Sequence, residues 1–200
     1  MIYLNCHTEE LDWEASLSRV SPQRREQALR YVKDSDRRLS LAAYLLLLQA
    51  LEEEYGILAP VEFGFGPRGK PFLKDYPHIH FNLSHCPGAA LCVVEASPVG
   101  CDIECVPPVL DEDLCRWVCS DQELAQIRQS ACPTVTFTRL WTRKEAFLKY
   151  TGEGLTDHLK ILLLLPEAKA VSFETVEAPD GTWVYSVCRS TQTQKCQYSR

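Results

Sequence analysis

The sequence predicts an α+β protein made of two similar halves, residues 1–98 and 99–200. Three observations predict this fold. Long segments with helical periodicity alternate with groups of short strands rather than with single strands, which is typical of α+β proteins. This order of elements occurs twice along the chain. Pro98, followed by Val99-Gly100, marks the point where the second series begins.

The first half begins with two predicted helices. Ser21 followed by Pro22 indicates a helix start, with the serine as the cap and the proline at the first helical position. We expect this helix to carry the basic residues of the segment that follows. A second, more apolar helix is expected from about residue 35 to 55, ending at Gly56. Short strands are expected over residues 61–65, 80–83 and 89–95, with a Gly66-Pro67-Arg68-Gly69 turn after the first.

The second half opens with a strand and continues with helices. The strand is expected over residues 99–104, before a Pro107-Pro108 break. Ser120 and Glu123 form a capping box, which is sufficiently explained by the start of a helix. Helices are expected around residues 110–118, 120–131 and 134–150, the last ending at Gly152. Strands are expected near residues 159–165, 171–176 and 183–188, with a Pro179-Asp180-Gly181 turn between the last two.

Composition and charge exclude several classes of protein. The 200 residues are 46% hydrophobic and 24% charged, which is ordinary for a soluble globular protein with a full core. There are 21 basic and 27 acidic residues, a net charge of −6, which disfavours a bulk nucleic-acid binder. The longest apolar run, residues 39–51, contains Ser40 and Gln49 and is too short to cross a bilayer. We expect neither a nucleic-acid partner nor a membrane association.

The ten cysteines argue against a disulfide framework. No C-x-x-C pair is present, and no Cys/His cluster has the spacing of a zinc site; His78 and His80 lack further ligands at a suitable spacing. The N-terminus becomes acidic before a signal-peptide segment can form. We therefore expect a cytoplasmic protein whose cysteines are reduced and mostly act as small buried hydrophobic residues.

Two acids alternate in the predicted strand that opens the second half. In Val99-Gly100-Cys101-Asp102-Ile103-Glu104, the carboxylates of Asp102 and Glu104 project to the same face. Neighbouring carboxylates repel unless a cation or protons lie between them, and hard oxygen ligands at this spacing suit Mg²⁺. A solvated strand face that carries two acids is the alternative explanation.

The long helix predicted over 134–150 carries a second group of candidate residues. Trp141, Glu145 and Lys149 are four residues apart and share one face. Charged groups on a partly apolar face are costly unless they are used or paired. The alternative is an ordinary surface pair between Glu145 and Lys149, which would contribute a few tenths of a kcal/mol.

The turn over residues 66–69 could bind a phosphate or the edge of a base, because it exposes backbone N–H groups and keeps Arg68 and Lys70 close together. A predicted strand then ends in two hydrogen-bonding side chains, Ser84-His85, and a capped strand end is the alternative explanation for His85. The segment from Arg19 to Arg38 holds seven basic residues and three acidic ones, a local charge of +4. Such a patch suits a phosphate or an acidic protein, although a solvated helix face explains most such runs.

Taken together and in this order, the motifs resemble those of a known family. They are Gly69-Lys70-Pro71, Phe81-Asn82-Leu83-Ser84-His85, Val99-Gly100-Cys101-Asp102-Ile103-Glu104, and Trp141-Thr142-Arg143-Lys144-Glu145-Ala146-x-x-Lys149. The sequence resembles the 4′-phosphopantetheinyl transferase superfamily over about residues 20 to 155. It is most similar to the Sfp-type branch, in which two similar α+β halves form a pseudo-dimer in one chain.

The resemblance implies transfer of phosphopantetheine from coenzyme A to a serine of an apo acyl or peptidyl carrier protein, with release of 3′,5′-ADP. It implies Mg²⁺ as cofactor, held by Asp102, Glu104 and Glu145. Glu145 would also act as the base toward the serine, directly or through a water, and Lys149 would stabilise charge on the pyrophosphate. The resemblance further assigns coenzyme A contacts to Ser84 and His85, to Lys70 and Pro71, and, at the 3′-phosphate, to Arg24 and Arg38. We expect a monomer.

The sequence departs from the family pattern at Gln27, where relatives often carry a basic residue, and the chain is short for this branch. Two other functions would use the same acids. One is a Mg²⁺-dependent hydrolase that cleaves the pyrophosphate of coenzyme A or another nucleotide. The other is a non-catalytic module that binds coenzyme A or a carrier protein, although a pure binder has no need of a base beside a metal site.

Overall fold

A computed structural model describes residues 1–154 and 156–191. The N-terminal half contains β1 (Ile2–Asn5), the 3₁₀ helix η1 (Thr8–Glu10), α1 (Trp13–Ser18), α2 (Pro22–Leu29), α3 (Asp34–Tyr55), β2 (Phe63–Phe65), β3 (Pro71–Leu73), β4 (His80–Cys86) and β5 (Ala89–Glu95). The C-terminal half contains β6 (Val99–Cys105), α4 (Glu112–Val118), α5 (Asp121–Gln129), α6 (Pro133–Thr151), the 3₁₀ helices η2 (Leu159–Leu164) and η3 (Pro166–Ala170), β7 (Val171–Glu177) and β8 (Trp183–Ser190). The predicted α+β class is confirmed.

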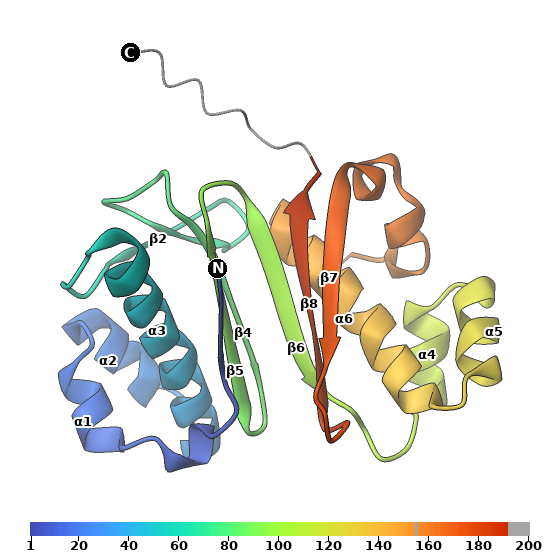
Figure 1. Ribbon diagram of the computed structural model, residues 1–200, viewed down its shortest axis with the longest axis horizontal. Helices are drawn as coiled ribbons and strands as arrows, with labels where there is room; N and C mark the ends of the chain where they lie inside the picture. The colour runs from blue at the N-terminus through green and yellow to red at the C-terminus, as the bar shows by residue number, and fades with distance from the viewer. Residues whose placement is uncertain (155, 192–200) are drawn as a thin grey trace.

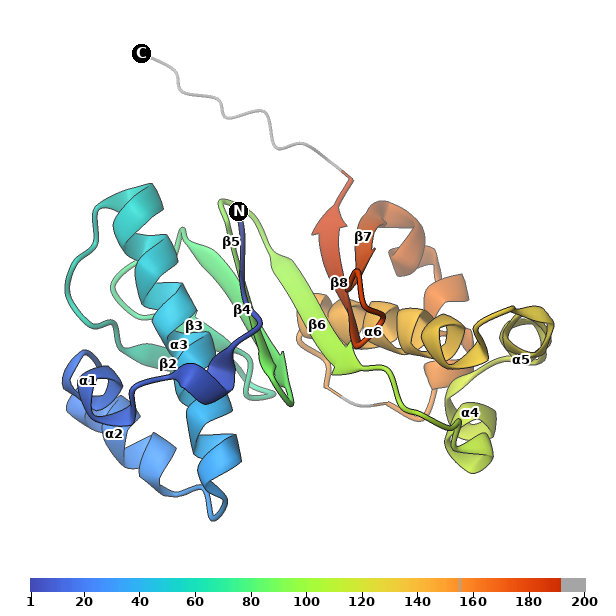
Figure 2. The ribbon, with the colours of Figure 1, turned by 60° about the horizontal axis from the view of Figure 1, so that its bottom comes forward.

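Two antiparallel three-stranded sheets form the centre of the molecule. Their strand orders are β1-β5-β4 and β6-β8-β7, and β2 pairs with β3 in a separate hairpin. Figure 1 shows α1, α2 and α3 outside the first sheet and α4, α5 and α6 outside the second, and Figure 2 shows the same arrangement from another side. The two halves therefore meet sheet to sheet, with β4 and β6 as neighbours.

Each half has its own hydrophobic core, and a third cluster joins the two. In the first core, α3 buries Leu41, Leu47 and Leu51 completely. In the second, α6 buries Phe147 and Leu148. The third cluster draws on β5, β6 and β8 and includes Leu91, Val93, Cys101, Ile103 and Val187. Because β6 faces α6 on one side and the first half on the other, its side chains are buried on both faces.

Two side chains of β4 accept hydrogen bonds from backbone N–H groups of β6, and these bonds connect the two halves. Asn82 Oδ1 accepts a hydrogen bond of 2.7 Å from the N–H of Cys101, and Ser84 Oγ accepts one of 3.3 Å from the N–H of Ile103. All four residues are buried. These bonds satisfy N–H groups of β6 that would otherwise be buried without a partner. They also fix the position of β6 along β4.

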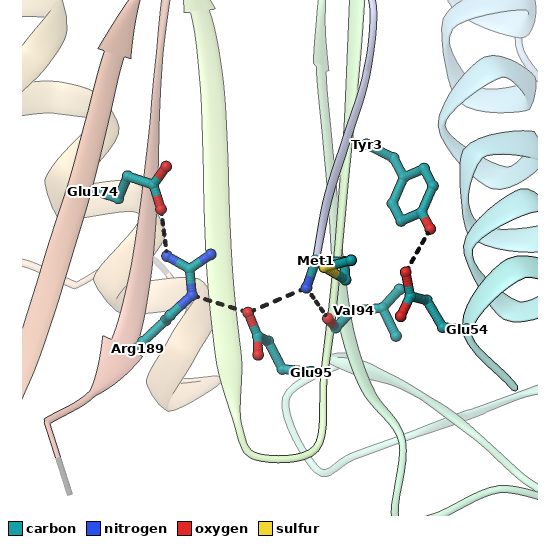
Figure 3. Close-up of polar contacts among 7 residues, drawn as sticks. All are labelled: Met1, Tyr3, Glu54, Val94, Glu95, Glu174 and Arg189. Carbon is teal, nitrogen blue, oxygen red and sulfur yellow. Dashed lines mark hydrogen bonds and ion pairs between the residues drawn. The ribbon is translucent and has the colours of Figure 1, made fainter. Parts of the chain in front are cut away.

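A second set of polar contacts connects β5 of the N-terminal half with β7 and β8 of the C-terminal half. Figure 3 shows Arg189 of β8 between Glu174 of β7 and Glu95 of β5, at 2.8 and 2.9 Å. The N-terminal amine lies 3.5 Å from the Glu95 carboxylate and donates a 2.7 Å bond to the carbonyl of Val94. The network joins three strands of the two sheets, so it restrains the angle between the halves.

Residues 159–165 do not form the strand predicted for them. They form η2, in which Leu159 and Leu162 are buried while Ile161 and Leu164 are 47% and 64% exposed. A spacing of three between buried residues is typical of a 3₁₀ helix. The sequence prediction failed here because an unbroken apolar run has no readable period.

The first predicted helix is shorter than expected, whereas α3 agrees with the helix predicted from about residue 35 to 55 and ends at Gly56 as predicted. The helix that begins at Pro22 ends at Leu29, and α3 begins at Asp34. Acids in the first turn of α3 favour a helix start at this point. The basic residues of the 19–38 segment are therefore divided among the end of α1, where Arg19 lies, the helices α2 and α3, and the turn that joins these two helices. No helix in the described part of the chain is both long and apolar enough to span a membrane.

Candidate active site

A cleft lies where β4, β6 and α6 converge. One cavity, of about 440 Å³, is lined by Arg24, Ser40, Ala43, Leu83, Ser84, His85, Asp102, Glu104, Trp141, Glu145 and Lys149. A second, of about 330 Å³, is lined by Arg68, Gly69, Lys70, Pro71, Asn82, Leu83, Glu145, Leu148, Lys149, Gly152 and Gly154. Because the two cavities share Leu83, Glu145 and Lys149, they adjoin one another. The fold thus brings together most of the predicted site residues from both halves.

The Asp102 carboxylate is the most buried acid of the site, with 3% of the residue exposed. Its Oδ1 accepts hydrogen bonds from Ser84 Oγ at 2.9 Å and from Lys149 Nζ at 2.7 Å. Its Oδ2 is buried and has no hydrogen-bond partner among the described residues. A buried carboxylate oxygen without a hydrogen-bond partner is energetically unfavourable. The site is therefore suited to receive a cation or a proton at Oδ2.

Glu104 lies two residues further along β6 and faces the same cavity. Burial, and to a lesser degree the charge of Asp102, raise its pKa from 4.5 to about 7. The indole N–H of Trp141 donates to its Oε1 at 3.4 Å, which partly opposes the rise. The explanation of Asp102 and Glu104 as a solvated strand face is therefore wrong.

Glu145 approaches the two acids from α6. Its Oε1 is buried, and no group in the described part of the chain forms a hydrogen bond with it. Burial raises the pKa of Glu145 and the Asp102 charge raises it further, while Lys149 lowers it. The predicted alternative of a Glu145–Lys149 surface pair is not what forms, because Lys149 turns to Asp102 and Ser84 instead.

These carboxylates fit a divalent cation that shares its coordination with a ligand. In the described residues, no three His, Cys, Asp or Glu side chains lie close enough to hold an ion by themselves. Mg²⁺ is usually bound by one or two carboxylates together with water and substrate phosphates. Asp102 Oδ2 and Glu145 Oε1 are unused oxygens of the right chemistry in a shared cavity.

Gly100 explains how α6 comes so close to β6. A Cβ at this position would overlap the carbonyl oxygen of Ala146 and the backbone nitrogen of Tyr150. Only glycine permits this contact between helix and strand. The glycine of the Gly-x-Asp-x-Glu motif therefore sets the distance between the acids of β6 and Glu145 of α6.

The two arginines predicted at a phosphate site are placed differently. Arg24 lines the larger cavity, where it stacks over the Tyr44 ring and hydrogen-bonds Ser40 and Gln27. Its Nε is buried and finds no hydrogen-bond acceptor within residues 1–154 and 156–191. Arg38 is not among the residues lining either cavity; its guanidinium donates to the carbonyl of Leu11 at 2.6 Å.

The other predicted ligand contacts lie along the cleft. His85 lines the larger cavity and is exposed, and desolvation together with the Lys149 charge lowers its pKa. Pro71 begins β3 and lines the smaller cavity. Lys70 lines the same cavity, but its ammonium binds two backbone carbonyls. Ser84, which the resemblance gave to a phosphate, is committed to Asp102, Lys149 and the backbone of β6.

Sequence reasoning missed Lys144, which precedes Glu145 and connects α6 to α4, α5 and η2. Its side chain is fully buried, and its Nζ binds Glu123 Oε2 at 2.7 Å and the carbonyls of Val118 and Leu159 at 2.8 and 2.9 Å. Glu123 thus completes the predicted capping box with Ser120 and also neutralises Lys144. The available signal was helical spacing, because Lys144 lies four residues after Leu140 and three and four residues before Phe147 and Leu148, which are all buried.

Comparison with known proteins agrees with this geometry. A family model described as the 4′-phosphopantetheinyl transferase superfamily matches residues 98–197, half of the chain, and one described as 4′-phosphopantetheinyl transferase, N-terminal, matches residues 7–98. The chain belongs to the 4′-phosphopantetheinyl transferase superfamily. The two-part match and the relatives below place it in the Sfp-type branch of this superfamily.

Several curated transferases of this superfamily are similar over most of their length. The 4′-phosphopantetheinyl transferase psf-1 of Bacillus pumilus is 32% identical over 182 residues, which are 84% of this chain and 78% of that protein. Sfp of Bacillus subtilis (strain 168) is 29% identical over 158 residues, 78% of this chain and 70% of the relative. AcpT of Salmonella typhi is 34% identical over 137 residues, 66% and 68% of the two chains.

Proposed function

We propose that this member of the superfamily transfers the phosphopantetheine group of coenzyme A to a serine of an apo acyl or peptidyl carrier protein and releases 3′,5′-ADP. The observation that carries the proposal is the pair of unpartnered buried oxygens, Asp102 Oδ2 and Glu145 Oε1, in a cavity that also holds Lys149. The names of the similar transferases support it.

Asp102, Glu104 and Glu145 are the residues that would hold Mg²⁺. When bound, the ion would neutralise charge on the pyrophosphate of coenzyme A. Lys149 adds a second positive charge beside Asp102, where it would stabilise the charge that develops on the leaving 3′,5′-ADP. Ser84 holds both Asp102 and Lys149 in place by its hydroxyl.

The transfer is a displacement at phosphorus. The serine oxygen of the carrier forms a bond to the phosphorus that bears the pantetheine, and the bond from this phosphorus to the 3′,5′-ADP oxygen breaks. The serine proton passes to Glu145, directly or through a water. Burial suits Glu145 to this role, because a raised pKa makes its carboxylate a better proton acceptor.

The coenzyme A contacts are also proposals. Lys70 and Pro71 would border the nucleotide in the smaller cavity, and His85 and Arg24 would face its phosphates from the larger one. Arg38 would reach the 3′-phosphate only by leaving the carbonyl of Leu11. Gln27 receives a hydrogen bond from Arg24, which keeps part of that guanidinium away from a phosphate.

Further proposals concern the oligomeric state of the protein, its division into halves, its partners and its location. The cleft is complete within one chain, because residues 1–98 and 99–200 each supply part of it, and this supports a monomer with the predicted division into halves. The net charge of −6 supports the absence of a nucleic-acid partner. A cytoplasmic location without membrane association remains a prediction from the sequence.

The decisive experiment incubates the protein with coenzyme A, Mg²⁺ and a panel of apo carrier proteins, and measures the carrier mass. We expect one phosphopantetheine per carrier. Asp102→Asn and Glu145→Gln should each lower the rate by about 10²–10⁴-fold. Glu112→Gln, at an exposed acid on α4, serves as the matched control and should keep full activity. Full activity in either site variant would contradict the assignment of the acids.

The same reaction mixture separates the alternatives. A pyrophosphate hydrolase would release 3′,5′-ADP from coenzyme A when no carrier is present. A non-catalytic module would bind coenzyme A without releasing product, and its affinity would not respond to Glu145→Gln. Either result, without modification of any carrier, would overturn the proposed transfer.

A further inference from the structure

The side chain of Lys70 forms hydrogen bonds within the protein instead of pointing freely toward a phosphate ligand. Lys70 follows the β2–β3 turn, in which the N–H of Gly66 binds the Lys70 carbonyl at 2.9 Å and the N–H of Gly69 binds the Gly66 carbonyl at 2.9 Å. The backbone of Lys70 is therefore fixed. From this position its side chain crosses to the C-terminal half.

The Lys70 ammonium joins three elements. Its Nζ donates to the carbonyl of Val99, where β6 begins, at 3.1 Å, and to the carbonyl of Tyr150, in the last turn of α6, at 3.0 Å. The last carbonyls of a helix have no partner within the helix and carry the negative end of its dipole. A lysine bound there satisfies a backbone acceptor and is attracted by the dipole at the same time.

The surroundings favour these carbonyls as the partners of Lys70. No carboxylate in the described part of the chain forms an ion pair with its ammonium. The stem packs beside Gly152, where a Cβ would come within 3.3 Å of Lys70 Cδ. Gly152 ends α6 in the left-handed conformation, with φ 74°, and so turns the chain past the lysine. Burial of the Lys70 ammonium lowers its pKa.

The same turn makes a second contact, with the segment that directly follows α6. Arg68 Nη1 donates to the carbonyl of Glu153 at 3.2 Å. The smaller cavity of the cleft is lined by both of the segments that are joined in this way, residues 68–71 of the turn and Leu148, Lys149 and Gly152 at the end of α6. The width of this cavity therefore depends on how firmly the turn holds the end of α6.

From these contacts we infer that Lys70 is a positioning residue: it clamps the β2–β3 turn to the end of α6 and the start of β6, and it sets the width of the nucleotide pocket without itself binding a phosphate. The part that concerns coenzyme A rests on the proposed function. The clamp itself does not, because it concerns contacts within the chain.

The clamp is tested first without any ligand, by hydrogen exchange. Lys70→Met removes both bonds, and we expect amides of residues 66–72 and 148–152 to exchange about tenfold faster, as for loss of hydrogen bonds to a charged group. Lys70→Arg keeps the charge and the donors and should restore much of the protection. Lys74→Met is the matched control, because Lys74 lies in the same hairpin but binds only Glu62, at 3.0 Å. Unchanged exchange in Lys70→Met would overturn the clamp.

Kinetics and binding then separate positioning from phosphate contact. We expect Lys70→Met to raise KM for coenzyme A about tenfold and to change kcat less than about threefold, because Glu145 and Lys149 remain held through Asp102 and Gly100. Affinity for coenzyme A and for dephospho-coenzyme A should fall by the same factor, with unchanged dependence on salt. A loss confined to coenzyme A, or a weaker salt dependence, would assign Lys70 to a phosphate instead.

The two proposals fail in different ways. If the unmodified protein binds neither coenzyme A nor 3′,5′-ADP, the proposed function is wrong, while the exchange result still decides the clamp. If the protein binds coenzyme A and Lys70→Met shows the normal exchange pattern, the clamp is wrong and the proposed function stands.

Discussion

The ammonium of Lys149 and the carboxylate of Asp102 form an ion pair between α6 and β6, with Nζ 2.7 Å from Oδ1. The Asp102 side chain is 4% exposed and that of Lys149 is 30% exposed. Ser84, from the other half of the molecule, hydrogen-bonds both partners. One polar cluster thus serves the packing of the two halves and the candidate active site.

Removal of Lys149 from the ion pair with Asp102 should lower the free energy of unfolding. Lys149→Met leaves a buried carboxylate without its cation, and we expect the free energy of unfolding to fall by about 2 kcal/mol, less than for a fully buried pair because Lys149 is partly exposed. Adding Asp102→Asn should recover most of this loss. Urea denaturation of the four proteins without Mg²⁺ measures the coupling, and simple additivity of the two changes would contradict it.

Gly100→Ala should disturb the contact between α6 and β6. The added methyl group would overlap the backbone at Ala146 and Tyr150, neither of which is the end of a flexible side chain. We expect a loss of about 3 kcal/mol or more in the free energy of unfolding. Gly66→Ala is the control, because a Cβ there meets no atom closer than 3.6 Å and should cost less than about 1 kcal/mol. Equal unfolding midpoints for the two variants would show that the close approach is absent.

Glu123 should matter more than an ordinary capping residue. Glu123→Gln leaves the fully buried Lys144 ammonium without a counter-charge, for an expected loss of about 3 kcal/mol. Ser120→Ala removes only the cap and should cost about 1 kcal/mol. Thermal unfolding compares the two variants. The interpretation fails if Lys144→Met in the Glu123→Gln background gives no recovery.

The acid pair of β6 predicts a specific pH dependence in the metal-free protein. The pKa of Glu104 is raised from 4.5 to about 7, so between these values the folded protein holds a proton that the unfolded chain releases. The contribution of Glu104 to the free energy of unfolding should therefore decline as the pH rises from about 4.5 to about 7, and then level off. Urea denaturation at several pH values, without divalent ions, should show that the Glu104→Gln variant lacks this decline. A constant difference between the two proteins would refute the raised pKa.

Local patterns in the sequence were sufficient to find the acids of the site. Alternation in a strand placed Asp102 and Glu104 on one face, and helical spacing placed Glu145 and Lys149 on one stripe. Both are consequences of backbone geometry within a single element, and the structure has the corresponding strand and helix. The α+β class followed from the same kind of periodicity. The apolar run at 159–165 was assigned wrongly because it has no such period.

The tertiary structure alone decided which partners these residues have. Ser84 and Asn82 bind β6, Lys70 binds the end of α6, and Arg38 binds a loop carbonyl away from the cleft. Each of these bonds joins residues far apart in the chain. A polar side chain in a buried interface bonds to whichever unsatisfied backbone group packing brings near it, and no local period records that choice. The sequence therefore determined which charged groups the cleft contains, while the contact between the halves determined which of these cations bond to a carboxylate and which bond to backbone carbonyls.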